Sequence, residues 1–283
     1  LSFIDAVAEA GANAIKFQTH IADEESSNFD DFRVRVFPQD ASRKDYWRRM
    51  QFSKDEWLVL AAHSENRGLV FLSSPFSNKA VDILSDCEIA AWKIASGEIF
   101  NYPMLDKILL TNKPLLISTG MSSWQEIDEI WQYTHGNERV LFQCTTEYPS
   151  SPKNIGLNNI PIFKKKYPDA VIGLSDHSGE IYPSLAAYML GARVFEVHVA
   201  WSKKMFGPDT PASLTIEQLE ELSRNLNLQA QTLASPVDKN LMRQEKNELV
   251  KLFGRGIYAK REIAKGDVIS ETDLNYLKPH SES

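Results

Sequence analysis

Short apolar runs rich in β-branched residues recur along the chain, and most are followed by an amphipathic helical pattern. The runs that predict strands are 14–17, 69–72, 91–94, 115–117, 140–142, 171–174 and 194–197. Several helix starts carry a hydroxyl with an acidic or amide residue three positions later, as at Ser53, Ser123 and Thr215. This regular alternation of strand and helix predicts a sheet of parallel strands.

The number and spacing of these strands predict a (β/α)8 barrel. Seven strands are visible, and the helical pattern at residues 1–11 stands where the crossover after a further strand would be. We therefore expect a TIM barrel whose first strand lies outside this sequence. The alternative is an open doubly wound sheet, although no glycine-rich phosphate loop follows an early strand. The polar stretch between Thr19 and Gln51 directly follows a strand, which in a barrel places it over the mouth of the active site.

The pattern of polar and apolar residues changes after residue 234. Ser235 and Pro236 open a charged stretch, and from Arg255 onward short apolar runs surround a turn at Lys265 and Gly266. We expect a catalytic barrel over residues 1–234, a linker over 235–254 and an incomplete β module over 255–283. So short a module cannot form a core of its own and is expected to pack against a larger surface.

Composition narrows the classes of function. The 283 residues are 43% hydrophobic, enough for one large core, and the formal net charge is -7 without a cluster of basic residues. We therefore expect no nucleic-acid partner, and no apolar run is long enough to predict a membrane span. The two cysteines cannot form a disulfide framework, which favours a cytoplasmic protein. Cys144 is interpreted as a packing residue.

Polar side chains end every predicted strand, on the rim where barrels carry their active sites. Lys16 and Lys93 lie within otherwise apolar strands, where a buried ammonium needs a compensating anion. One interpretation is a cradle for phosphate and carboxylate groups. The hydroxyls that would complete this cradle are Ser96, Ser118 and Ser175. The other interpretation is a structural ion pair of lysine with Glu98 or Glu196.

His177 and His198 each end a predicted strand, and the two strands are consecutive, so the imidazoles are expected side by side. They could share a divalent ion and leave coordination positions open for water and a substrate oxygen. The alternative is that one of them is an ordinary histidine of the rim. The carboxylates that could act in acid–base catalysis or orient the histidines are Glu98, Asp176, Glu196 and Asp209.

Taken together, these motifs resemble the N-acetylneuraminate (sialic acid) synthase family, which includes legionaminic and pseudaminic acid synthases and a spore-coat polysaccharide branch. The segments that carry the resemblance are GANAIKFQT (11–19), SSPF (73–76), KIASGEI (93–99), ISTGM (117–121), QCTTEYP (143–149), GLSDHS (173–178), EVH (196–198) and GPD (207–209). The resemblance implies a TIM barrel followed by an antifreeze-like (SAF) domain, of which residues 255–283 resemble the first part.

The resemblance implies an enzyme that condenses phosphoenolpyruvate with an N-acetylated aldose, N-acetylmannosamine or an analogue, to a nonulosonic acid with release of phosphate. It implies that His177 and His198 bind a divalent metal, Mn²⁺ or else Mg²⁺ or Co²⁺. The residues it places around phosphoenolpyruvate are Lys16, Lys93, Ser96, Ser118 and Ser175. Those it places near the sugar or the metal-bound water are Gln18, Tyr148 and Asp209.

Catalysis is assigned to Glu98, which matches the family's catalytic carboxylate, together with Lys93 and Asp209. Arg255 matches an arginine that the family inserts into the barrel of a partner subunit, so a homodimer is expected. Two other functions stay open. One is a metal-free aldolase that forms a Schiff base through Lys16 or Lys93, and the other is a non-catalytic barrel that binds a glycan or a partner.

Overall fold

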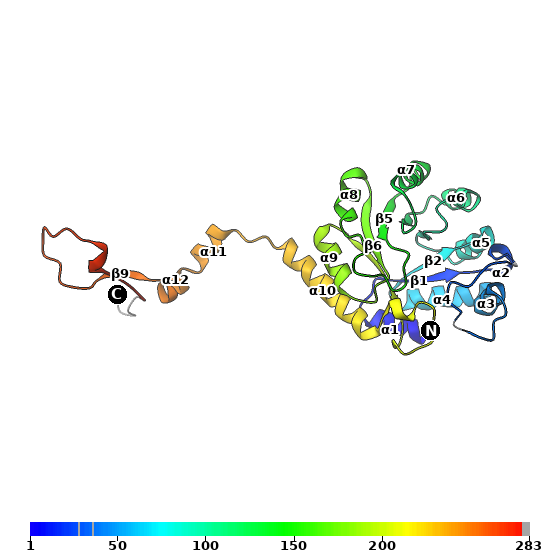
Figure 1. The fold of residues 1–283 in the computed structure, drawn as a ribbon, viewed down its shortest axis with the longest axis horizontal. Coiled ribbons are helices and arrows are strands. Elements are labelled where there is room, and N and C mark those ends of the chain that lie inside the picture. The colour runs from blue at the N-terminus through cyan, green and yellow to red at the C-terminus, as the bar shows by residue number, and fades with distance from the viewer. Residues whose placement is uncertain (28, 36, 279–283) are drawn as a thin grey trace. The chain divides into compact units, whose positions relative to one another are not determined.

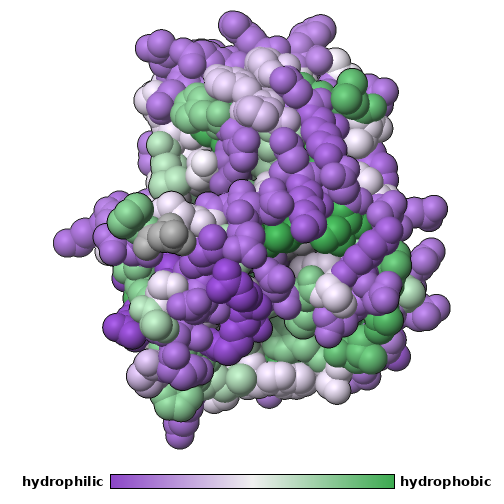
Figure 2. Space-filling view, turned by 90° about the vertical axis from the view of Figure 1, so that its right-hand side faces the viewer, coloured by the Kyte–Doolittle hydropathy of each residue, from purple (hydrophilic) through white to green (hydrophobic). Residues whose placement is uncertain are grey.

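The computed structural model describes residues 1–27, 29–35 and 37–278. Contacts between residues divide the chain into two compact units, Leu1–Leu228 and Gln229–Ser283. The face shown in Figure 2 is largely hydrophilic, and its apolar side chains are interrupted by polar and charged ones. No helix in these described ranges is long and apolar enough to cross a membrane.

The first unit is built on a curled sheet of parallel strands with helices between them (Figure 1). The strands are β1 (Ala14–Thr19), β2 (Val70–Pro75), β3 (Trp92–Ile94), β4 (Leu115–Ser118), β5 (Arg139–Cys144), β6 (Val171–Asp176), β7 (Val194–Val199) and β8 (Ser213–Leu214). Their order in the sheet is their order in the chain, whereas a doubly wound sheet reverses its strand order at a switch point. The barrel class is therefore confirmed.

Every predicted strand is present, and β8 is an addition that the sequence pattern did not reveal. It pairs with β7 through only two residues, His198 with Ser213 and Val199 with Leu214, which is too short for a periodic signal. The sheet is open at its edge strands, because in the described chain β1 pairs only with β2 and β8 pairs only with β7. A cavity of about 620 Å³ is lined by residues of β1 and β7.

Most helices of the first unit lie between successive strands, whereas the first precedes β1 and the last follows β8 and extends past Leu228 into the second unit. They are α1 (Ser2–Glu9), α2 (Ala22–Glu25), α3 (Arg43–Met50), α4 (Lys54–Asn66), α5 (Asn78–Asp86), α6 (Tyr102–Leu109), α7 (Trp124–Tyr133), α8 (Asn159–Lys166), α9 (Tyr182–Leu190) and α10 (Ile216–Ala234), with a short 3-10 turn at Thr210–Ala212. The predicted starts are confirmed, since Ser53 and Ser123 each form a reciprocal capping box with the glutamate three residues later. Thr215 and Gln218 exchange the equivalent pair of hydrogen bonds.

The strands separate an apolar outer layer from a polar interior. Trp92 and Ile94 of β3 and Leu115 and Ile117 of β4 are fully buried in the main hydrophobic core, which also takes in α5 and α6. Side chains alternate between the two faces of a strand, so the neighbouring positions face the interior. The interior-facing side chains toward the strand ends are Lys16, Gln18, Lys93, Ser118, Cys144, Ser175, Glu196 and His198.

The second unit follows α10 and contains a small antiparallel sheet. Helices α11 (Lys239–Glu245) and α12 (Asn247–Phe253) occupy most of the stretch expected to be a linker. Strand β9 (Gly256–Ala259) then pairs with β10 (Leu274–Leu277). Between the strands, Val268 and Ile269 lie outside the sheet and are 89% and 56% exposed. The module therefore carries apolar side chains that its own sheet does not cover.

Candidate active site

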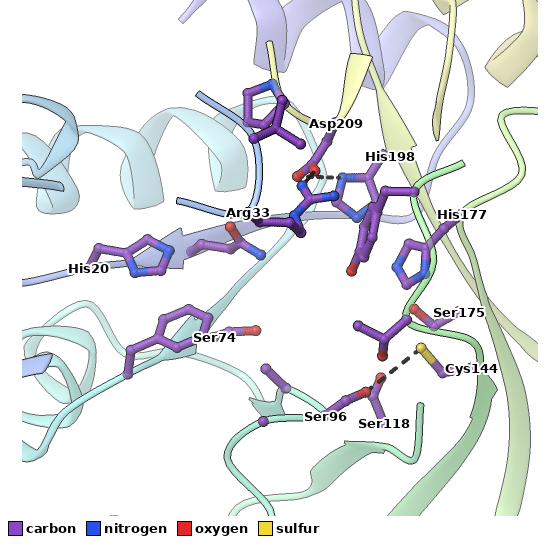
Figure 3. A pocket seen from close by; sticks show the side chains of 18 of the residues that line it. His20, Arg33, Ser74, Ser96, Ser118, Cys144, Ser175, His177, His198 and Asp209 are labelled. Carbon is purple, nitrogen blue, oxygen red and sulfur yellow. Dashed lines mark hydrogen bonds and ion pairs between the residues drawn. The ribbon is translucent and has the colours of Figure 1, made fainter. Parts of the chain in front are cut away.

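A pocket of about 360 Å³ lies at the carboxyl ends of the strands, where a barrel positions its catalytic groups. Figure 3 shows His177, His198 and Asp209 on one side of a common space, Ser96, Ser118 and Cys144 on another, and His20 and Ser74 opposite the histidines. The predicted site residues that line it are Lys16, Gln18, Lys93, Ser96, Ser118, Tyr148, Ser175, His177, His198 and Asp209. Glu98 and Arg255 are not among the lining residues.

Two lysines share one glutamate in the inner part of the pocket. Lys93 is 2% exposed, and its Nζ donates to Ser118 Oγ at 2.7 Å and lies 3.6 Å from Glu196 Oε1. Lys16 Nζ lies 3.9 Å from the same oxygen, which also accepts a hydrogen bond from Ser175 Oγ at 3.0 Å. The ion pair considered from the sequence is therefore present, but one carboxylate faces two ammonium groups. The cluster has a surplus positive charge when both lysines are protonated.

The pKa values of this cluster follow from its burial and charges. Burial alone would raise the pKa of Glu196, but the charges of Lys16 and Lys93 lower it to about 2. Burial lowers the pKa of Lys93, and the charge of Glu196 opposes that effect only in part. Glu196 is thus the carboxylate that faces both lysines, and a bound phosphate or carboxylate would share that role.

His177 and His198 lie beside each other, with ring centroids 5.2 Å apart. His177 Nδ1 donates to the carbonyl oxygen of Thr145 at 2.7 Å, which fixes the orientation of the ring. Burial alone would lower the pKa of His177, but its interactions with Cys144 and Thr145 raise it. Burial and the charge of Lys16 lower the pKa of His198 to about 4, so its ring is neutral at neutral pH. Neutral imidazoles with a fixed tautomer are suited to bind a metal ion. Across the described residues no group of three or more His, Cys, Asp or Glu side chains is placed to hold one.

Tyr148 and Asp209 complete the histidine side of the pocket. The ring of Tyr148 lies 4.1 Å from that of His177 and 5.7 Å from that of His198, centroid to centroid. Burial, with nearby Cys144 and Asp209, raises the pKa of the Tyr148 phenol, so it stays a hydrogen-bond donor. Asp209 Oδ2 lies 3.8 Å from His198 Nδ1. These groups can orient a polar substrate next to the histidines.

Cys144, interpreted from the sequence as a packing residue, has polar groups next to its thiol. It lines the pocket, and its Sγ accepts a hydrogen bond from Ser96 Oγ at 3.8 Å. Burial alone would raise the pKa of the thiol, but His177 and Lys93 lower it. Gly120 N donates to Ser96 Oγ at 3.0 Å, and a Cβ at Gly120 would lie 2.9 Å from both Cys144 Sγ and Ser96 Oγ. The backbone therefore approaches Ser96 only because residue 120 is a glycine.

The remaining predicted carboxylates and the arginine are placed elsewhere. Glu98 accepts a hydrogen bond from Asn101 Nδ2 at 2.8 Å, and burial raises the pKa of its carboxyl. Asp176 is buried and accepts from Ser178 Oγ at 2.6 Å, outside the pocket lining. Arg255 belongs to the second unit, where its Nη1 donates to the carbonyl oxygen of Tyr276 at 3.0 Å. The catalytic role of Glu98 and the ligand contact of Arg255 stay predictions.

The segment after β1 forms one wall of the pocket. The sequence predicted that this segment covers the mouth of the active site, but it did not predict which of its residues line the pocket. Its pocket-lining residues, here named the loop wall, are Phe32, Arg33, Val34, Phe37, Arg43, Tyr46 and Trp47. The Arg33 guanidinium lies 4.4 Å above the Tyr148 ring and binds Asp209. His20 is stacked between Trp47 and Phe76, at centroid distances of 3.6 and 4.2 Å. The concentration of aromatic and arginine residues between positions 29 and 49 was the signal available in the sequence.

Comparison with known proteins supports the family resemblance that the sequence motifs indicate. The model of the NeuB family matches residues 3–238. N,N'-diacetyllegionaminic acid synthase of Campylobacter jejuni is 31% identical over 98% of this chain and 84% of that protein. N-acetylneuraminate-9-phosphate synthase of Homo sapiens is 32% identical over 93% of this chain and 74% of that protein.

A solved structure agrees at the level of the fold. The crystal structure of N-acetylneuraminic acid synthetase from Leptospira borgpetersenii serovar Hardjo-bovis in complex with citrate superposes with a TM-score of 0.74. It is 26% identical, and the match covers 88% of this chain and 84% of that one. Because the family model spans most of the chain and named relatives exceed 30% identity over nearly all of it, the protein belongs to the NeuB family.

Proposed function

We propose that the protein condenses phosphoenolpyruvate with an N-acetylated aldose, N-acetylmannosamine or an analogue, to a nonulosonic acid and releases inorganic phosphate. The observation that carries the proposal is the pair of buried Lys93 and partly buried Lys16, which share the single carboxylate of Glu196 directly beside two histidines. A surplus of buried positive charge favours a small anion with several oxygens. The relatives named above are synthases of acids of this class.

The inner part of the pocket would hold phosphoenolpyruvate. Lys16 and Lys93 supply charge, and the hydroxyls of Ser96, Ser118 and Ser175 supply directed hydrogen bonds. Ser118 already accepts from Lys93, and Ser175 already donates to Glu196, so the hydroxyls are positioned before a ligand binds. Such preorganisation removes part of the cost of orienting the anion.

His177 and His198 would hold a divalent ion, for which we propose Mn²⁺, with Mg²⁺ and Co²⁺ as alternatives. The ring of His177, oriented by its hydrogen bond to Thr145, and the neutral ring of His198 fit this role, and two protein ligands leave room for water and substrate. When bound, such an ion supplies Lewis-acid polarisation of a carbonyl oxygen. Because both histidines lie beside Tyr148, an acceptor bound there would have its aldehyde next to the anion held by the lysines.

The chemistry then forms one bond and breaks another. The enol carbon of phosphoenolpyruvate forms a carbon–carbon bond to the aldehyde carbon, whose oxygen takes up a proton and becomes a hydroxyl. Water adds to the resulting cationic carbon and gives up a proton, and the carbon–oxygen bond to phosphate breaks. Gln18, Tyr148 and Asp209 line the pocket and would orient the acceptor, and Asp209 would take part in the proton transfers. Glu98 lies outside the pocket lining, and its catalytic role rests on the family motif.

We further propose that the enzyme is a cytoplasmic homodimer in which Arg255 of one chain completes the pocket of the other. Its support is the apolar surface of the second unit, where Ile257 and Val268 are 63% and 89% exposed. Both cysteines are free, as expected of a protein in a reducing compartment. A bidentate arginine would add a carboxylate contact that the point charge of a lysine does not provide.

The direct test is incubation with phosphoenolpyruvate, Mn²⁺ and a panel of N-acetylmannosamine and its 6-deoxy diamino analogues. We expect equal amounts of inorganic phosphate and of a product whose mass is that of acceptor plus pyruvate, and we expect EDTA to abolish both. Trapping of the enzyme with substrate by borohydride, together with activity in EDTA, would instead establish a Schiff-base aldolase. The absence of phosphate release with every acceptor would point to a binding protein.

A further inference from the structure

His20 forms a largely buried pair with a carboxylate at the edge of the pocket. It directly follows β1, lines the pocket, and lies on the side opposite His177 and His198 (Figure 3). Its Nδ1 donates to Glu25 Oε1 of α2 at 2.7 Å. The two side chains are only 12% and 10% exposed. Neither residue has a part in the reaction proposed above.

The ring of His20 is held by aromatic side chains on both faces. Trp47 of α3 stacks on it with centroids 3.6 Å apart and planes 16° apart. Phe76, which follows β2, stacks on it at 4.2 Å and 13°. The hydrogen bond to Glu25 fixes the rotation of the ring within this stack. His20 therefore cannot turn toward another partner without losing both ring contacts.

Each member of the pair has a buried atom without a hydrogen-bond partner among the described residues. These atoms are His20 Nε2 and Glu25 Oε2. Folded proteins seldom leave buried polar atoms unsatisfied, because their lost contact with water is not replaced. With a proton on Nδ1, the neutral ring presents a lone pair at Nε2, where it can accept a second proton. The ring can thus become charged while Glu25 remains its partner.

Glu98 is a carboxyl on which both members of this pair act. Burial raises the pKa of Glu98, the hydrogen bond from Asn101 opposes that effect, the charge of Glu25 adds to it, and the charge of His20 opposes it. The fold brings these groups to one region, because His20 follows β1 and Glu98 lies shortly after β3, with only β2 between the two strands. His20 and Glu25 are the charged groups that act on Glu98.

We propose that His20 and Glu25 are positioning residues for Glu98, and that together they set how firmly its carboxyl holds a proton during the reaction. The negative charge of Glu25 favours the protonated form of Glu98, and a positive charge on His20 favours the ionised form. The inference rests on the proposed function, in which Glu98 has a catalytic role.

Such a balance suits the proton transfers of the proposed reaction. The aldehyde oxygen takes up one proton, and the water that adds to the cationic carbon gives one up. A single carboxyl that releases a proton and later regains one can serve both steps. Glu98 must therefore be stable in both forms, and the opposing charges of Glu25 and His20 provide for each of them.

His20→Phe and Glu25→Gln should shift the titration of Glu98 in opposite directions. Phenylalanine keeps a ring between Trp47 and Phe76 but removes the charge that lowers the pKa of Glu98, so this carboxyl should hold its proton to higher pH. Glutamine keeps an acceptor for Nδ1 but removes the charge that raises this pKa, so Glu98 should ionise at lower pH. A pair with only a structural role would not produce shifts of opposite sign.

The titration is followed by ¹³C NMR of the full chain, labelled at the carboxyl carbon of glutamate, over the pH range in which the chain stays folded. The Glu98 signal is the one missing from Glu98→Gln. Phosphate release from phosphoenolpyruvate with Mn²⁺ and N-acetylmannosamine or its analogues is then measured across the same range. If Glu98 supplies the proton, activity falls as the pH rises through its titration. This limb should move to higher pH in His20→Phe and to lower pH in Glu25→Gln.

His63→Phe is the matched control, because His63 also pairs with a carboxylate, that of Asp5 at 2.8 Å, but lies outside the pocket lining. It should leave the Glu98 signal and the pH profile unchanged. Circular dichroism checks folding. His20→Gln, whose amide can still donate to Glu25, replaces His20→Phe if the latter does not fold.

An unchanged titration of Glu98 in both variants, or shifts in the same direction, would overturn the inference. A Glu98 titration that shifts as expected while the pH profile stays in place would also overturn it, because the pair would then not act on catalysis. If no acceptor yields phosphate in any variant, the proposed function fails. The NMR titration would still decide whether His20 and Glu25 govern the proton of Glu98.

Discussion

At the scale of single residues, the chemistry of the site depends on one shared carboxylate. Glu196 compensates Lys16 and Lys93 at once, and its own pKa is held at about 2 by their charges. The sequence showed that buried lysines needed an anion, because an unpaired ammonium in an apolar strand is costly. It did not show which carboxylate would be the counter-ion of the lysines, since Glu98 and Glu196 both lie near the ends of strands. The structure assigns the pairing to Glu196.

Glu196→Gln should destabilise the protein by roughly 3 kcal/mol at neutral pH, because it leaves the buried ammonium of Lys93 and the partly buried ammonium of Lys16 without their anion. The folded pKa of Glu196 is depressed below its ordinary value of 4.5 to about 2, so its contribution is complete above pH 4.5 and is lost as the pH falls toward 2. Urea unfolding across this window should show the two proteins converge at low pH.

The control for this prediction is Glu248→Gln, which removes an exposed partner of Lys251. Its effect should stay below about 1 kcal/mol at every pH. Equal stability of Glu196→Gln and wild type at neutral pH would show that Glu196 is not the counter-ion of the lysines.

Mn²⁺ should raise the melting temperature of wild type and not that of His177→Ala, because the ion stabilises the folded state by the free energy of its binding. At a concentration of about 100 times Kd the stabilisation is about 2.7 kcal/mol. Differential scanning fluorimetry with and without EDTA measures the effect without any substrate. His63→Ala is the control, since His63 pairs with Asp5 outside the pocket. A full Mn²⁺ response in His177→Ala would refute the two-histidine site.

At the scale of elements, the alternation of apolar and polar positions predicted the strands and, with them, most of the pocket. Each strand has one face toward the helices and one toward the interior, so Lys93 between Trp92 and Ile94 must face the interior. The loop wall could not be derived in this way. Its residues follow no period, and their positions depend on contacts such as the Trp47 and His20 stack, which join separate segments. Glu98 shows a different limit of the sequence. Its position in the family motif predicted a catalytic role, but it is not among the residues that line the pocket.

Gly120→Ala should lower kcat/KM by about tenfold or more, because its Cβ would lie 2.9 Å from Ser96 Oγ and Cys144 Sγ and closer still to Thr146 Oγ1, and would displace these pocket-lining side chains. Steady-state kinetics with varied phosphoenolpyruvate should place the loss mainly in the KM for that substrate. The matched change is Gly136→Ala, whose φ of 100° makes alanine strained although no heavy atom lies within 4 Å. It should cost about 1 kcal/mol of stability and leave kcat/KM unchanged. Equal kinetic effects of both changes would contradict the cradle at Ser96.

At the scale of the whole molecule, each of the two compact units leaves apolar surface that its own strands and helices do not cover. The sheet of the first unit is open at its edge strands β1 and β8, and a cavity of about 620 Å³ is lined by residues of β1 and β7. The second unit exposes apolar residues such as Ile257 and Val268 around a two-stranded sheet. The sequence predicted both features from the strand count and from the small size of the module, since neither depends on side-chain detail.

Mixing inactive Arg255→Ala chains with inactive His177→Ala chains should restore activity if Arg255 serves the pocket of the partner subunit. Random exchange makes half of the dimers mixed, and each mixed dimer has one site with both residues intact, so about a quarter of wild-type activity is the upper limit. Size-exclusion chromatography of differently tagged chains must show that exchange took place. Full exchange without recovered activity, or a fully active monomer, would exclude a shared site.

The central claim is that this pocket joins phosphoenolpyruvate to an aldose and releases phosphate by breaking a carbon–oxygen bond. The most direct measurement uses phosphoenolpyruvate labelled with ¹⁸O at the bridging oxygen, together with N-acetylmannosamine, Mn²⁺ and the purified protein. Mass spectrometry should find the label in inorganic phosphate and an unlabelled product with the mass of acceptor plus pyruvate. Label retained in the organic product, or phosphate formed without a condensation product, would contradict the account.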